Sequence, residues 1–134
     1  MREYTQKTKQ QAGFTLAELL IVVAIIAVLV AIAIPIYSAQ LEKSKEATDM
    51  ANVRSAYAAV VAKFIVEGND DGSMEVSATQ GQTGWQDSEG GKFTTQVNGS
   101  ESELSFSAVT KPGEYVIGVE YAADGAASVY IRGE

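Results

Sequence analysis

Residues 13–36 read GFTLAELLIVVAIIAVLVAIAIPI, and this stretch decides how the chain is organised. Twenty of the twenty-three residues from Phe14 to Ile36 are apolar. At a rise of about 1.5 Å per residue a helix of this length extends roughly 34 Å, which matches a hydrocarbon core of about 30 Å. The stretch is therefore long enough to cross a membrane once, and nothing else in the sequence is.

The polar residues before this stretch predict its orientation. Residues 1–13, MREYTQKTKQQAG, carry three basic side chains and one acidic side chain. Positive charge beside an apolar segment resists translocation. We expect the amino end to stay in the cytoplasm and the rest of the chain to lie outside.

The apolar stretch has three interpretations from its residues alone. A cleaved secretory signal is usually shorter, although the small residues of Ala31-Ile32-Ala33 offer a cleavage site just before Pro35. A plain signal anchor explains the length but not Glu18, which lies inside the apolar stretch. A carboxylate in that position needs a partner. The third interpretation is therefore a helix that assembles with others.

Composition excludes several classes of function. The 134 residues suffice for one core, and they include no cysteine and no histidine. Disulfides, thiolate nucleophiles, Fe–S clusters and Ser-His-Asp catalysis are therefore excluded. The net charge of −7 disfavours binding to nucleic acid, which depends on clustered Lys and Arg. We expect no catalytic residue, no metal site and no cofactor.

Residues 37–68 are amphipathic and predict that the helix continues beyond the apolar stretch. Apolar side chains repeat at spacings of 3, 4, 3 and 4, at Met50, Val53, Tyr57, Val60 and Phe64, with Val61 and Ile65 widening the stripe. Charged residues are expected on the other faces, namely Glu42, Lys43, Lys45, Glu46, Asp49, Arg54 and Lys63. Gly68-Asn69 is expected to end the helix, and Pro35 to kink it.

Residues 69–134 predict a small antiparallel β-sheet head. The clearest signal is the alternation from Tyr115 to Tyr121, followed by an Asp124-Gly125 turn and a return strand over 128–131. Residues 93–97 and 104–108 flank a turn at 98–100, and Lys111-Pro112-Gly113 marks another. Residues 69–92 are expected to form a connecting loop. The predicted fold class is α+β, with one long N-terminal helix packed on this sheet.

The order Gly13-Phe14-Thr15-Leu16-Ala17-Glu18, then a pure apolar run and Pro35, resembles the class III signal of type IV prepilins and pseudopilins. The resemblance implies a pilin-like fold and a structural, non-enzymatic role. It also implies that prepilin peptidase cleaves residues 1–13 from the chain between Gly13 and Phe14, and methylates the amine of Phe14. Glu18 then becomes the fifth residue, and its carboxylate pairs with the terminal ammonium of Phe14 in a neighbouring subunit during assembly.

The resemblance also implies partners and a location. The subunit waits in membrane lipid as a single-pass protein, and a cytoplasmic assembly ATPase with an inner-membrane platform protein then moves it into a homopolymeric filament on the cell surface. Many pilins close a C-terminal loop with a disulfide, which this chain lacks. Cysteine-free, acidic members look most like those of Gram-positive bacteria.

Other candidate sites have simpler interpretations. Oxygen-bearing side chains in residues 69–75 suggest calcium, but the EF-hand pattern fails and a solvated turn is favoured. Asn98-Gly99-Ser100 fits a glycosylation acceptor, although Asn-Gly also favours a hairpin turn. Glu101 and Glu103 resemble a hydrolytic carboxylate pair without a pocket, so an exposed strand edge is expected.

Three functions remain open at this point. The first is a pilin that polymerises into a type IV pilus, and the second is a pseudopilin that serves DNA uptake or secretion. Direct DNA contact is not expected, because residues 66–134 hold twelve acidic and three basic side chains. The third is a monomeric, signal-anchored surface domain in which Glu18 is dispensable.

Overall fold

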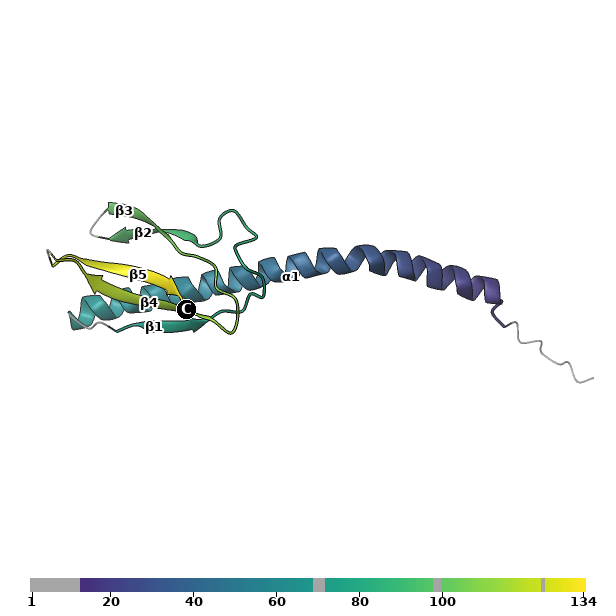
Figure 1. Cartoon of the computed structure of the whole chain (residues 1–134), viewed down its shortest axis with the longest axis horizontal. Helices are drawn as coiled ribbons and strands as arrows, with labels where there is room; N and C mark the ends of the chain where they lie inside the picture. Colours follow the sequence, from purple (N-terminus) through teal and green to yellow (C-terminus); the bar gives the residue numbers. More distant parts are fainter. Residues whose placement is uncertain (1–12, 69–71, 98–99, 124) are drawn as a thin grey trace, which may run out of the picture. The chain divides into compact units, whose positions relative to one another are not determined.

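The computed structural model describes residues 13–68, 72–97, 100–123 and 125–134. One helix and five strands follow one another along the chain (Figure 1). Helix α1 covers Leu16–Glu67, and the strands are β1 Met74–Ser77, β2 Lys92–Val97, β3 Ser100–Ser105, β4 Glu114–Tyr121 and β5 Ala127–Gly133. The chain divides into two compact units, Met1–Tyr37 and Ser38–Glu134. The predicted α+β class with one long N-terminal helix is confirmed.

Helix α1 ends where the sequence predicts. Gly68 adopts a φ of 80°, a conformation that glycine reaches without steric cost, and its N–H donates to the carbonyl of Phe64 at 3.0 Å. The backbone remains helical on both sides of Pro35, so this proline does not break the helix.

The strands form two small antiparallel sheets rather than the single sheet expected. One has three strands in the order β1-β4-β5, and the other is the β2–β3 hairpin. The predicted hairpin of β4 and β5 is confirmed, with Val119 opposite Val129. In the other hairpin the return strand already starts at Ser100. The Asn98-Gly99 turn and Asp124 lie outside the described residues.

Strand β1 corrects the prediction of a loop across residues 69–92. Its four residues pair with β4, and Met74 lies opposite Ile117. The segment is short and rich in polar residues, so its pattern gives no strand signal. It becomes a strand because the alternating, half-buried edge of β4 supplies a partner for its backbone.

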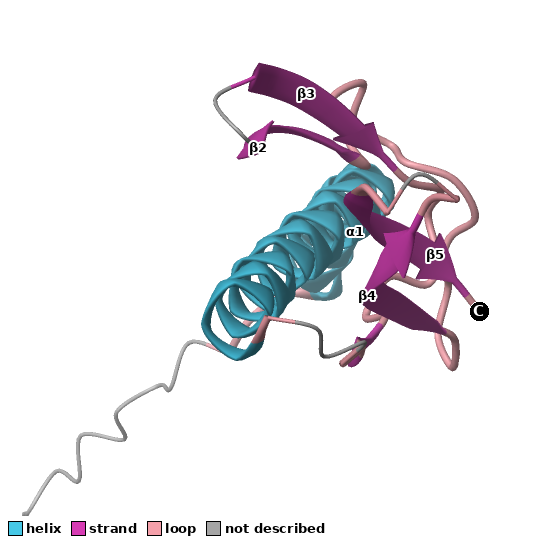
Figure 2. Ribbon diagram, turned by 90° about the vertical axis from the view of Figure 1, so that its left-hand side faces the viewer, coloured by secondary structure: helices cyan, strands magenta, loops and turns pink. Residues whose placement is uncertain are grey.

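The core of the second unit lies between α1 and the two sheets (Figure 2). The predicted stripe supplies Val53 and Val60, both nearly inaccessible, while Met50, Tyr57 and Phe64 pack at its margin. Ile65, by contrast, is 74% exposed. The buried members of this core are Val53, Ala56, Val60, Ala78, Phe106, Tyr115, Ile117 and Val119.

The prediction was wrong for three acidic residues of α1. Glu42, Glu46 and Asp49 were expected on solvated faces, but all three are buried. Their spacings of 4 and 3 continue the stripe of Val53, so they point toward the same side of the helix. Backbone N–H groups of residues 79–87 meet them there, and this contact compensates for the burial of their charge.

Candidate functional site

The candidate site is the N-terminal segment from Gly13 to Ile36, all within the first unit. Gly13 and Phe14 precede the helix, and the side chain of Phe14 is 93% exposed. An ideal Cβ built on Gly13 would meet no atom within 4 Å. The backbone at the expected cleavage point is therefore open to an approaching protein.

Thr15 and Glu18 form a capping box at the start of α1. The N–H of Thr15 donates to Glu18 Oε2 at 2.8 Å, and the N–H of Glu18 donates to Thr15 Oγ1 at 3.2 Å. This reciprocal pair satisfies two donors that a helix start otherwise leaves unpaired. The carboxylate also lies at the positive end of the helix dipole.

Sequence reasoning selected Glu18 but missed Thr15. The available signal was the Thr-x-x-Glu spacing directly before an apolar run, which is the sequence pattern of a capping box. The structure thus brings Glu18 together with a partner inside its own chain. A carboxylate has two oxygens, so this contact leaves room for a further, charged partner.

The apolar side chains that follow Glu18 are uncovered. Every Phe, Leu, Ile and Val from Phe14 to Ile36 is at least 46% exposed. The helix that includes them is long and apolar enough to cross a membrane. A continuous apolar surface of this size marks a segment that lipid or other protein covers.

The remaining candidate sites gain no support as chemical centres. Residues 69–71 of the possible calcium loop lie outside the described residues, as do Asn98 and Gly99. Glu101 and Glu103 are exposed on β3. No group of three potential metal ligands occurs in the described ranges of the chain.

Comparison with known proteins agrees with the N-terminal motif. Residues 8–34 match the family model described as the prokaryotic N-terminal methylation motif. No solved structure matches the chain. The motif marks proteins that are made as precursors, then cleaved and methylated, and the apolar helix suits membrane anchoring before assembly. Residues 8–34 therefore carry the class III signal that is typical of type IV prepilins and pseudopilins.

Proposed function

We propose that this chain is a structural subunit that polymerises through residues 14–36 into a type IV pilus. The proposal is carried by one observation: the methylation motif leads directly into a helix whose apolar side chains are uncovered. Such a surface is compatible with lipid before assembly and with neighbouring helices afterwards. The acidic head then lies outside the membrane.

Processing is proposed to occur between Gly13 and Phe14, followed by methylation of the Phe14 amine. Gly13 presents no side chain to a protease and has open space around its Cα. Removal of residues 1–13 takes away the basic leader. It also places a new ammonium group on Phe14, the residue directly before Thr15 of the capping box. Prepilin peptidase, an assembly ATPase and a membrane platform protein are the proposed partners.

In this proposal the Glu18 carboxylate pairs with the terminal ammonium of Phe14 in an adjacent subunit. Apolar contacts gain little when lipid is exchanged for protein, so a polar contact decides the axial stagger of the helices. Pro35 remains the proposed position of a kink. The same motif also begins pseudopilins, and a short filament for DNA uptake or secretion is the alternative.

The first prediction concerns the mature protein. Cells with prepilin peptidase should yield surface filaments whose subunit starts at Phe14 and carries one methyl group, as measured by intact mass and N-terminal peptide mass. Cells without the peptidase should retain the whole chain in the membrane. A subunit that starts after Ala33, or surface material with the leader intact, would exclude this proposal. Processed protein without long filaments would favour the pseudopilin.

The second prediction separates the charge of Glu18 from its capping role. Glu18→Gln keeps an oxygen that can accept the Thr15 N–H but removes the negative charge. We expect normal processing and at least a tenfold loss of sheared filaments, because about 1.4 kcal/mol per contact changes an association equilibrium tenfold.

Thr15→Ala is the matched control, since it removes the capping hydroxyl and keeps the charge. We expect it to retain most of the filament yield. If Glu18→Gln assembles normally while Thr15→Ala and Glu18→Ala do not, Glu18 acts through the helix start and the intersubunit pair is wrong.

A further inference from the structure

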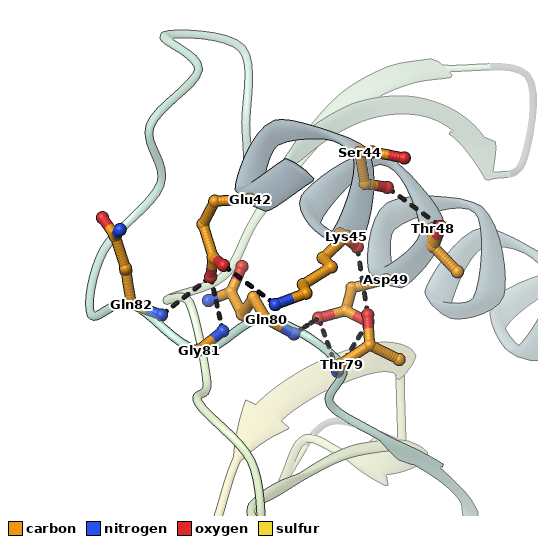
Figure 3. Close-up of polar contacts among 9 residues, drawn as sticks. All are labelled: Glu42, Ser44, Lys45, Thr48, Asp49, Thr79, Gln80, Gly81 and Gln82. Atoms are coloured by element: carbon orange, nitrogen blue, oxygen red, sulfur yellow. Dashed lines mark hydrogen bonds and ion pairs between the residues drawn. The ribbon is translucent and has the colours of Figure 1, made fainter. Parts of the chain in front are cut away.

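Residues 78–91, here called the strap, connect β1 to β2 and are fastened to α1 by three carboxylates. Glu42, Glu46 and Asp49 are 5%, 3% and 0% exposed. Figure 3 shows the strap crossing α1 at Glu42 and Asp49. Each of these carboxylates accepts hydrogen bonds from main-chain N–H groups of the strap.

Asp49 holds the first residues of the strap. The N–H of Thr79 donates to both carboxylate oxygens, at 2.9 and 3.0 Å, and the N–H of Gln80 donates to Oδ2 at 3.2 Å. The hydroxyl of Thr79 lies 2.6 Å from Oδ1. These hydrogen bonds fix the point where the strap leaves β1.

Glu42 and Glu46 hold the following segments. Glu42 Oε1 accepts the N–H groups of Gly81 and Gln82, the latter at 2.7 Å, while Oε2 lies 3.3 Å from Lys45 Nζ (Figure 3). Glu46 accepts the N–H of Gln86 at 2.7 Å and that of Asp87 at 3.3 Å. Each segment of the strap thus donates its main-chain N–H groups to one carboxylate side chain.

These contacts are strongest with the ionised form. A carboxylate accepts with both oxygens and forms charge-assisted bonds, whereas a protonated carboxyl group must donate from one oxygen. Glu42, Glu46 and Asp49 also lie at helical spacings of 4 and 3, where like charges repel. Protonation therefore weakens the strap contacts and relieves the repulsion at the same time.

Several other charged or titratable groups lie near these carboxylates. Lys45 contacts Glu42, and Tyr115 of β4 lies near Asp49 and Glu46. A surface pocket beside Glu46 is also lined by Lys43, Arg54, Asp87 and Glu89. Burial raises the pKa of Tyr115, and the charges of Asp49 and Glu46 add to the effect. Tyr115 therefore keeps its proton throughout the acid range. Since the chain has no histidine, the carboxylates carry the response to acid.

We propose that the strap is an acid-released fastening, held on α1 while Glu42, Glu46 and Asp49 are ionised and detached when they bind protons. The rest of the second unit keeps its fold during release. Its central residues, such as Val53, Val60 and Ile117, bury apolar surface that does not depend on these carboxylates. The strap also has apolar anchors of its own, since Ala78 is buried in the core and Trp85 packs against it, but the contacts of its main-chain N–H groups with α1 go to the three carboxylates.

The sign of the pH effect follows from Glu42. The N–H of Gln82 contributes most to a lowered pKa of the Glu42 carboxyl, burial opposes it, and the N–H of Gly81 and then Lys45 lower it further. A lowered pKa in the folded state stabilises that state above the unfolded pKa of about 4.3. The stabilisation is lost as the pH falls through the folded value. Release therefore takes place on the acid side of the ordinary glutamate pKa.

The single tryptophan of the chain reports on the strap directly. Trp85 lies edge-on to Phe106 at 5.6 Å and stacks on Tyr115 at 6.4 Å between ring centroids. Detachment of the strap moves this ring from the core into water. The emission of Trp85 then shifts to longer wavelength, and acrylamide reaches the ring and quenches it.

The experiment is an acid titration of the full chain in detergent micelles from pH 7 to pH 3. Trp85 emission and quenching are recorded beside the far-ultraviolet circular dichroism. We expect the Trp85 change to come at higher pH than the loss of secondary structure, and to reverse on return to pH 7. A single coincident transition in all signals would overturn the proposal, because it would indicate global unfolding.

Two substitutions sharpen the test. Glu42→Gln keeps an acceptor for both strap N–H groups, so the Trp85 transition should persist with about one proton fewer taken up. Both oxygens of Asp49 accept N–H groups of the strap, and Asp49→Asn replaces one of these oxygens with an NH₂ donor. The strap should then be detached, and Trp85 accessible to water, already at pH 7. Glu103→Gln, at an exposed position of strand β3, is the control. It should change neither the proton uptake of the Trp85 transition nor the accessibility of Trp85 at pH 7. An unchanged proton uptake in Glu42→Gln, or a strap still closed in Asp49→Asn, would overturn the proposal.

Discussion

Gln80 is fully buried, and neither polar atom of its side-chain amide has a hydrogen-bond partner among the described residues. Its backbone is well placed, since its N–H donates to Asp49 and its carbonyl accepts the N–H of Lys111 at 3.1 Å. The backbone contacts therefore hold the side chain in a place where its amide is unsatisfied. An unpaired buried amide costs about 1–3 kcal/mol.

The third prediction follows from this amide. Gln80→Met keeps the length of the side chain and removes both unpaired atoms, so it should stabilise the fold by about 1 kcal/mol. For a unit of this size the melting temperature should rise by about 4–8 °C. Thermal unfolding of the full chain in detergent, followed by circular dichroism, measures the change.

Gln82→Met is the control for Gln80→Met, because Gln82 is exposed and only its backbone contacts Glu42. It should leave the melting temperature nearly unchanged. A lower melting temperature for Gln80→Met than for the parent chain would mean that the amide has a partner in solution and contributes to stability.

At the scale of elements, the sequence predicted the helix and the β4–β5 hairpin well, because each shows its own period. The stripe through Val53 and Val60 follows the helical period, and the first half of β4 alternates between buried and half-buried residues. Both signals are local. They arise from side chains that one element places on a single face, so the partner need not be known.

The same reasoning failed where a non-local partner decides the outcome. Strand β1 exists because β4 pairs with it, and this partner lies forty residues away in sequence. Glu42 and Glu46 are buried because strap N–H groups meet them, which single-residue preferences cannot indicate. The spacing of the acids, in phase with the apolar stripe, was the signal that could have shown their burial.

The candidate site was predicted in part for a related reason. Gly13, Phe14 and Glu18 belong to a contiguous motif, and the family comparison confirms that motif. The capping partner of Glu18 was visible in the spacing but was not considered. The roles of these residues in cleavage and assembly depend on other molecules and stay predictions.

At the scale of the whole molecule, the chain consists of two units with different requirements. In the first unit the apolar side chains from Phe14 to Ile36 have no cover. In the second, all members of the buried core belong to residues 53–119. The head therefore holds a complete core without any residue of the apolar segment.

The fourth prediction is that the two units separate cleanly. A fragment of residues 38–134 should be folded and monomeric in water, because its core is intact and its surface is acidic. The chain with residues 14–37 should remain in solution only with detergent. Size-exclusion chromatography and circular dichroism of both, with and without detergent, test this. An unfolded fragment would show that the head depends on the apolar segment.

The fastening of the strap has a consequence for how its sequence can vary. The bonds from Glu42, Glu46 and Asp49 reach main-chain N–H groups, which almost every amino acid supplies. Exposed strap residues can therefore be exchanged freely without loosening the attachment, and proline at a bonded position is the substitution that removes a donor. Inherited variation should accumulate along this surface while the three acids beneath it stay fixed.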